Sequence, residues 1–212
     1  MDARAELKQI RPRVKRAGDF HHGDLREALV QSARQAVEKV GHGAISLRQV
    51  ADRLGVSQPA MYRHFADKGA LLAEVARRSG SEIEDAMRAA MQGKPDPFEA
   101  MRAGGRAYVG WAYAHPNLFR LMSSRIPSEH RAGPRPALPR EHYFFGMGGV
   151  VPIDDPLLAD SFRVSWAMVH GLANLVIERV FQLVDTDEQR LAVADQALDC
   201  YVEMLRAKWP RS

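Results

Sequence analysis

Several side chains in one short stretch of the chain have the chemistry needed to bind nucleic acid. The amide of Gln58 can form two hydrogen bonds with the edge of adenine or donate one to guanine. The guanidinium of Arg48 can reach guanine or a phosphate. The Tyr62 hydroxyl and the His64 ring can donate to phosphate oxygens, and Lys68 adds a positive charge. Together these side chains indicate DNA recognition.

Local sequence signals predict two short helices that would position these side chains. Ser46 and Gln49 have the spacing of a capping box, so a helix is expected to begin directly after Ser46. Gly55 suits the left-handed position that ends a helix, and Ser57 can cap the next one. Pro59 then falls in the first turn, where proline removes no helical hydrogen bond. Two helices joined by so tight a turn predict a helix-turn-helix, whose second helix lies in the major groove.

Residues 24–75 resemble the DNA-binding domain of the TetR family of transcriptional repressors. The resemblance depends on an apolar-faced helix at 24–41, then ISLRQVADRLGVS, then QPAMYRHFADKGALLAEV, with Lys68 three residues after Phe65. It implies that Arg48 and Gln58 contact bases. The predicted DNA-binding residues are Ser46, Arg48, Ser57, Gln58, Ala60, Tyr62, Arg63, His64 and Lys68.

For some residues of this region, the sequence indicates a more specific role. Ala60 offers only a methyl group, which could meet a thymine methyl. Arg63 is a further candidate for a phosphate contact. Phe65 is expected in the core of the small domain. His64 has no other histidine at metal-ligand spacing, so we expect no metal there.

Charge is concentrated toward the N-terminus. Residues 1–79 contain 15 Lys/Arg and 9 Asp/Glu, a net charge of +6, whereas residues 80–212 contain 15 and 17, a net charge of −2. Residues 1–20 are expected to be a flexible basic arm. Such an arm can follow phosphates or enter a minor groove, and the alternative is a disordered tail without a specific role.

The composition favours a soluble cytoplasmic protein. Cys200, the single cysteine, excludes an intramolecular disulfide and suits a reducing cytosol. We expect it to be a small core residue. The sequence has no apolar run long enough to span a bilayer and no signal-peptide pattern, so no membrane association is expected.

The hydrophobic periodicity predicts an all-α fold with two domains. Residues 21–78 are expected to form an N-terminal three-helix helix-turn-helix domain, and residues 79–212 a larger helical domain for ligand binding and dimerisation. Asp67 is expected to cap a fourth helix that runs toward Met91. Further helices are predicted at 98–114, 117–123, 155–183 and 186–209, with an irregular proline-rich connection at 124–156. Gly104, Gly105 and Gly110 within one helix indicate either close packing or a kink.

The second domain carries a possible effector pocket. Trp166, His170 and Gly171 resemble the Trp-x-x-x-His-Gly pattern of one TetR C-terminal subtype. Aromatic and polar side chains from several helices could line a pocket, or they could simply form the core. The candidates are Tyr108, Trp111, Phe119, Met122, Phe162, Trp166, His170 and Asn174.

The last two helices are candidates for a dimer interface. Apolar residues recur at three- and four-residue steps in the last helix, and the helix before it is apolar on more than one side. The family resemblance implies a four-helix interface between two subunits. The predicted interface residues are Leu175, Leu191, Ala194, Leu198, Tyr201 and Leu205.

These observations predict a homodimeric repressor that binds a palindromic operator in double-stranded DNA and is released by an unknown small-molecule effector. A transcriptional activator and an effector-independent, architectural DNA-binding protein are the alternatives within this fold. An enzyme or a small-molecule carrier is a third class. The sequence contains no nucleophile elbow, no phosphate-binding glycine loop, no paired Cys/His ligands and no triad-like set, so we expect neither catalysis nor a cofactor.

Overall fold

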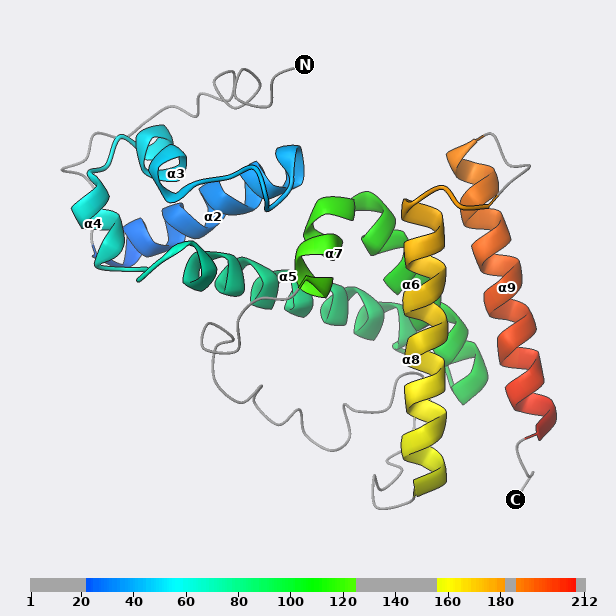
Figure 1. The fold of residues 1–212 in the computed structure, drawn as a ribbon. Helices are drawn as coiled ribbons and strands as arrows, with labels where there is room; N and C mark the ends of the chain where they lie inside the picture. The colour runs from blue at the N-terminus through cyan, green and yellow to red at the C-terminus, as the bar shows by residue number, and fades with distance from the viewer. Residues whose placement is uncertain (1–21, 125–155, 182–185, 209–212) are drawn as a thin grey trace. The chain divides into compact units, whose positions relative to one another are not determined.

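The computed structural model describes residues 22–124, 156–181 and 186–208, with only the backbone described at 22–24 and 156–163. All regular secondary structure in these ranges is α-helical (Figure 1). The helices are α2 (His22–Val40), α3 (Leu47–Leu54), α4 (Gln58–Tyr62), α5 (Lys68–Met91), α6 (Pro97–Ala114), α7 (Pro116–Ser123), α8 (Pro156–Ile177) and α9 (Asp187–Lys208). The expected all-α class is confirmed. The predicted arm at 1–20 and almost all of the irregular connection lie outside the described residues.

The chain divides into two compact units. The first contains the described residues up to Gly80 together with those from His115 to 124, and the second contains the remainder. Helix α7, which we expected in the second domain, therefore groups with the first unit. Helix α7 packs on α2, and two polar contacts with Glu38 near the end of α2 add to this packing. The Asn117 amide donates to the Glu38 carbonyl at 2.9 Å, and His115 Nδ1 lies 2.6 Å from Glu38 Oε1.

The first unit has a continuous apolar core. Helix α2 supplies one face of it, and α3, α4, α5 and α7 each contribute buried side chains. These are Leu29, Val30, Ala33, Val37, Val50, Ala51, Met61, Phe65, Leu71, Val75, Leu118 and Leu121. The predicted burial of Phe65 is confirmed.

In the second unit, α8 and α9 pack against α6 and run in opposite directions (Figure 1). The close approach of α9 to α6 depends on Gly105. A Cβ atom at this position would lie 2.8 Å from Cδ2 and 2.9 Å from Cδ1 of Leu198. Of the two roles considered for the α6 glycines, close packing therefore applies to Gly105. Gly110 has no atom within 4 Å of its ideal Cβ position.

Helix α8 ends earlier than predicted, at Ile177 rather than near residue 183. Arg179 adopts a left-handed conformation with φ of 55°, and its N–H donates to the Val176 carbonyl. The next N–H, that of Val180, reaches back to Leu175 at 3.0 Å. These two bonds form a Schellman motif. The motif usually uses glycine, so an arginine in its place gave no sequence signal.

The prediction that Cys200 is a core residue is wrong, because its side chain is exposed. The buried positions of α9 follow each other at four-residue steps: Arg190, Ala194, Leu198 and Val202. A residue two positions after Leu198 lies on the far side of the helix.

Candidate nucleic-acid interface

The helix-turn-helix begins with the predicted capping box. Ser46 Oγ accepts from the Gln49 N–H at 3.2 Å, and Gln49 Oε1 accepts from the Ser46 N–H at 2.9 Å. Gly55 ends α3 in the left-handed conformation with φ of 65°. The Val56 N–H then donates to the Ala51 carbonyl, which closes the turn toward α4. The sequence signals at both ends of α3 are confirmed.

Helix α4 is short and is held from one side. Ser57 Oγ caps it by accepting from the Ala60 N–H at 3.3 Å, and Pro59 lies in its first turn. Met61 is completely buried and anchors the helix to the core. Five residues cannot maintain a helix in water by propensity alone, so the Met61 anchor and the cap fix its orientation.

The candidate DNA-binding side chains are distributed around this anchor. Ser46, Arg48, Ser57, Gln58, Tyr62 and Arg63 are exposed, whereas Ala60, His64 and Lys68 are half-buried. Tyr62 is 52% exposed, which is unusual for a large aromatic side chain that has no partner to cover it. Arg48 Nε lies 3.7 Å from Asp52 Oδ2, and both side chains are exposed, so this pair restrains Arg48 little.

Lys68 differs from the expectation of a free phosphate anchor. Its amine donates to the Gly43 carbonyl at 3.2 Å, in the connection between α2 and α3. Burial lowers the pKa of the Lys68 amine. The helix that it begins is capped as predicted, since Asp67 Oδ1 accepts from the Ala70 N–H at 2.9 Å. Lys68 thus ties the start of α5 to the helix-turn-helix.

An ion-pair network near the recognition helix α4, the reader of the helix-turn-helix, was not predicted. Glu74 of α5 binds Arg77 and Arg78 of the same helix and Arg26 of α2. The Arg26 guanidinium also lies 5.1 Å from the centroid of the Phe65 ring. The spacing of Glu74, Arg77 and Arg78 was visible in the sequence as an i, i+3, i+4 pattern. The approach of Arg26 depends on the tertiary fold and had no local signal.

In the second unit, four of the effector candidates lie together. The Tyr108 hydroxyl is 2.9 Å from His170 Nδ1, and the Trp166 ring stacks on His170 at 5.0 Å between centroids. Burial raises the pKa of Tyr108 and lowers that of His170, which favours the neutral form of both side chains at neutral pH. The Asn174 amide donates to the His170 carbonyl at 2.8 Å.

The other effector candidates are placed differently. Phe119 and Met122 belong to α7 in the first unit, where Phe119 is buried. Trp111 is half-buried in α6. The side chain of Phe162 lies outside the described residues. The set of eight therefore does not form one cluster within a single unit.

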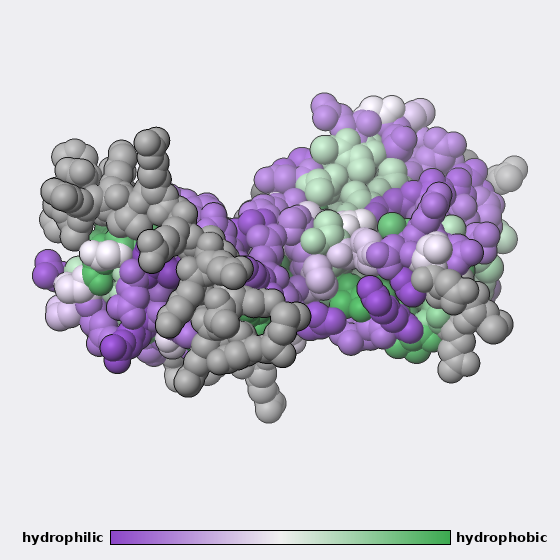
Figure 2. Space-filling view, turned by 90° about the horizontal axis from the view of Figure 1, so that it is seen from above, coloured by the Kyte–Doolittle hydropathy of each residue, from purple (hydrophilic) through white to green (hydrophobic). Residues whose placement is uncertain are grey.

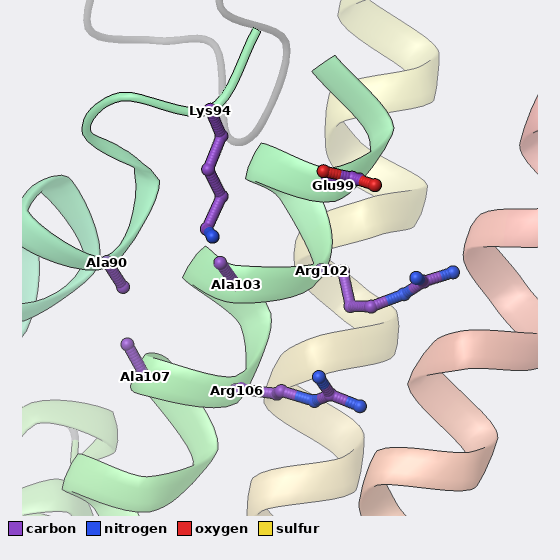
Figure 3. Close-up of a pocket in the computed structure, with 7 residues that line it drawn as sticks. All are labelled: Ala90, Lys94, Glu99, Arg102, Ala103, Arg106 and Ala107. Carbon is purple, nitrogen blue, oxygen red and sulfur yellow. The ribbon is translucent and has the colours of Figure 1, made fainter. Parts of the chain in front are cut away.

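The second unit also carries a surface groove of about 610 Å³ along α6 (Figure 3). It is lined by Ala90, Ala103 and Ala107 and by the charged residues Lys94, Glu99, Arg102 and Arg106. Figure 3 shows the Lys94 side chain extending toward Ala103. Arg102 lies 2.9 Å from both Asp199 and Glu203 of α9, so its charge is already compensated. None of the predicted effector residues whose side chains the structure describes lines this groove.

The predicted dimer-interface residues of α9 mostly pack within their own chain. Ala194 and Leu198 are buried in the second unit, and the Tyr201 hydroxyl lies 2.8 Å from Ser165 Oγ of α8. Leu191 and Leu205 are half-buried. The periodicity that we assigned to a partner subunit is therefore largely used for packing against α6 and α8. Leu175 of α8 is exposed.

Some apolar surface remains open on the same two helices. Val164 and Leu175, which lie on one face of α8, are exposed, as is Met204 of α9. Figure 2 shows apolar residues, in green, at the surface of the unit that carries these helices. In the described ranges, no group of histidine, cysteine and carboxylate side chains could hold a metal ion. Likewise, none of the helices there is long and apolar enough to cross a membrane.

Comparisons with known sequences agree with this architecture. Residues 29–75 match the profile of bacterial regulatory proteins of the tetR family, and residues 101–201 match that of the tetracyclin repressor-like C-terminal domain. The tetracycline repressor protein class C of Escherichia coli is 33% identical over 105 residues, which are 44% of this chain and 48% of that protein. The transcriptional activator FasR of Mycolicibacterium smegmatis is 26% identical over 108 residues, 51% of this chain and 49% of that protein. The chain thus matches about half the length of these relatives.

Solved structures show the same fold over most of the chain. A protein of unknown function from Rhodococcus sp. RHA1 aligns with a TM-score of 0.60 and 26% identity, covering 86% of this chain and 97% of that one. TetR from Acinetobacter baumannii AYE aligns with a TM-score of 0.63 and 16% identity, covering 89% and 98%. Since an N-terminal and a C-terminal region both match TetR-type profiles, the chain belongs to the TetR family of bacterial regulatory proteins.

Proposed function

We propose that the protein is a transcriptional regulator that binds a palindromic operator as a homodimer and is released from DNA by a small-molecule effector. The observation that carries the proposal is the position of α4. Met61 holds the helix to the core, while Gln58 and Tyr62, at its two ends, face solvent. A helix anchored on one side and polar on the other can enter the major groove without rearrangement.

The residues around α4 have the types needed for both kinds of DNA contact. Gln58, at the N-terminal end of the helix, is the proposed base reader together with Arg48. Tyr62, Arg63 and His64 are proposed to bind phosphates, which fix the position of the reader but carry no sequence information.

The homodimer is proposed from the open surface of α8 and α9. Val164, Met168, Gly171 and Leu175 follow each other at steps of four, three and four residues, the spacing of a seam between helices. Val193, Ala197, Cys200 and Met204 repeat the same steps on α9. Apolar side chains exposed along two neighbouring helices favour association with a second copy. Two-fold symmetry would then place two copies of α4 over a palindrome.

Effector control is proposed for the region around His170. A neutral imidazole and a neutral phenol next to an indole ring suit an uncharged, partly aromatic ligand. The similarity of Trp166, His170 and Gly171 to one C-terminal subtype also belongs to this proposal. To move the protein from mostly bound to mostly free, the ligand must prefer the released state by about 5 kcal/mol.

The test is selection of binding sites by the full-length protein from a library of random DNA duplexes at physiological salt. The proposal predicts enrichment of an inverted repeat whose half-sites are separated by about one helical turn. Enrichment of no sequence over bulk DNA would contradict it and would favour a non-specific, architectural binder.

Activation is the second candidate for the regulatory outcome. It is favoured by the similarity to FasR, which is an activator. A reporter gene placed behind the selected site separates the two, because a repressor lowers expression and an activator raises it.

A further inference from the structure

In the first unit, the carboxylate of Glu74 binds three guanidinium groups. Glu74 is 8% exposed. Arg77 binds it with a two-pronged contact, Nε to Oε2 and one terminal nitrogen to Oε1, both at 2.9 Å. Arg78 Nε donates to Oε1 at 3.0 Å, and Arg26 of α2 reaches the same oxygen at 3.5 Å. A buried carboxylate with this many donors is held in one position.

The network joins two helices at a second point. A terminal nitrogen of Arg78 donates to Glu27 Oε1 of α2 at 2.6 Å. Two side chains near the start of α2, Arg26 and Glu27, are therefore fixed to α5 through Glu74 and Arg78. Because α3 packs on α2, this contact also fixes the helix that precedes the reader.

A chain of contacts connects Glu74 to α4. The Arg26 guanidinium that binds Glu74 lies over the Phe65 ring, 5.1 Å from its centroid. Phe65 is buried, and its N–H donates to the Met61 carbonyl at 3.1 Å. Met61 is the anchor of α4. A cation over an aromatic ring has a preferred position, so holding Arg26 restrains the ring and the end of α4.

The three positively charged guanidinium groups stay close together because the Glu74 carboxylate is negatively charged. The hydrogen bonds from Arg77 hold the pKa of Glu74 at about 2, so the carboxylate stays ionised at neutral pH. Without it, three guanidinium groups would lose the carboxylate that they share. Arg26 belongs to α2, whereas Arg77 and Arg78 belong to the same helix as Glu74. Because Arg26 is also half-exposed, we expect it to leave its place over Phe65 first.

We propose that Glu74 is a positioning residue for sequence discrimination, acting through Arg26 and Phe65 on the orientation of the recognition helix α4. The inference rests on the proposed function, since it concerns how the reader is held against DNA. Glu74 itself touches no base. Its contribution is to the ratio between specific and non-specific affinity, because phosphate contacts tolerate small rotations of α4 better than paired hydrogen bonds to a base do.

The experiment compares two DNA probes, a duplex selected by the wild-type protein and a scrambled duplex of equal length and composition. Dissociation constants are measured for Glu74→Gln, Arg26→Met and the double variant. Asp85→Asn and Arg88→Met are the matched controls, because they change the net charge equally but break only an exposed pair within α5. Thermal melting establishes that each variant is folded.

Each single variant is expected to lower the specific-to-scrambled affinity ratio about tenfold, and the controls to leave it within about twofold. The double variant should lose no more than the larger single loss, because both changes break the same chain of contacts. A general loss of stability would lower both affinities together and leave the ratio unchanged.

Two results would overturn the inference. One is an unchanged ratio in both single variants; Arg26→Met, at a half-exposed site, serves this test even if Glu74→Gln does not fold. The other is a double variant whose losses multiply, which would mean that Glu74 does not act through Arg26. A wild-type protein that selects no sequence would instead contradict the proposed function.

Discussion

Single residues of the first unit divide into those proposed to read DNA and those that hold the recognition helix α4. Gln58 is exposed and makes none of the contacts that fix α4, whereas Met61 is buried and makes the main one. Lys68 stands between these groups, because its amine binds the Gly43 carbonyl and lies at the start of α5. The division leads to different expectations for substitution at each position.

Gln58→Ala should weaken binding to a selected duplex by roughly 1–3 kcal/mol and scrambled DNA much less, because only base contacts are lost. Binding measured by fluorescence anisotropy at one salt concentration tests this. Stability should be unchanged, since the side chain is exposed. Equal losses on both duplexes would show that Gln58 does not read a base.

Lys68→Ala should weaken binding to both duplexes similarly and reduce the dependence of affinity on salt, if the amine leaves Gly43 for a phosphate in the complex. The slope of log affinity against log salt is the measurement. A full slope in the variant would mean that Lys68 remains on Gly43 and serves only the fold.

The ionised Glu74 should make the free energy of unfolding depend on pH. Its pKa is near 2 in the folded chain, below the ordinary value of 4.5, so its contribution is complete above about pH 5 and is lost as the pH falls toward 2. The difference in unfolding free energy between wild type and Glu74→Gln should be on the order of 2–3 kcal/mol at pH 7 and shrink steadily between pH 5 and 3. Urea denaturation at several pH values measures it. A difference that stays constant over this range would contradict the assignment.

At the scale of helices, the best-predicted elements were those with local chemical signals. Ser46 with Gln49 marked the start of α3, Gly55 its end, and Asp67 the start of α5, and each was confirmed. The end of α8 at Ile177 was missed, because Arg179 occupies a position where glycine is the usual signal. Local patterns report caps and turns, but they give no signal for a left-handed residue other than glycine or asparagine.

Side-chain environments were harder to predict than helices. The apolar repeat of α9 was visible, but it could not show whether Leu198 faces α6 or a second subunit. The placement of α7 beside α2 also depended on contacts between residues far apart in the chain, such as Glu38 with Asn117. Periodicity identifies a face, whereas the fold decides what covers it.

The glycines of α6 provide a test at this scale. Gly105→Ala should destabilise the protein by about 1 kcal/mol or more, because the new Cβ would collide with both methyl groups of Leu198 in a packed core. Gly110→Ala should instead stabilise it by about 0.5–1 kcal/mol, since the site is open and alanine favours a helix. Opposite shifts of melting temperature check both expectations. A rise for Gly105→Ala would mean that Leu198 can move aside, and a fall for Gly110→Ala would contradict the second expectation.

At the scale of the molecule, the account requires two copies of the chain. Leu175→Asp and Met204→Asp should convert a dimer into a monomer, because each places a charge on the open apolar surface of α8 and α9. Ala89→Asp, on an exposed face of α5, is the control with the same added charge. Sedimentation velocity at micromolar concentration distinguishes the species. Dimers that persist in both variants would place the interface elsewhere.

The proposed function requires α4 to enter the major groove twice, once in each half of a palindrome. Dimethyl sulfate protection on a selected duplex tests it most directly, because the reagent methylates guanine N7 in the major groove and adenine N3 in the minor groove. We expect protected guanine N7 atoms in two half-sites about one helical turn apart, and loss of that protection with Gln58→Ala. Protection confined to adenine N3, or a single unrepeated patch, would contradict it.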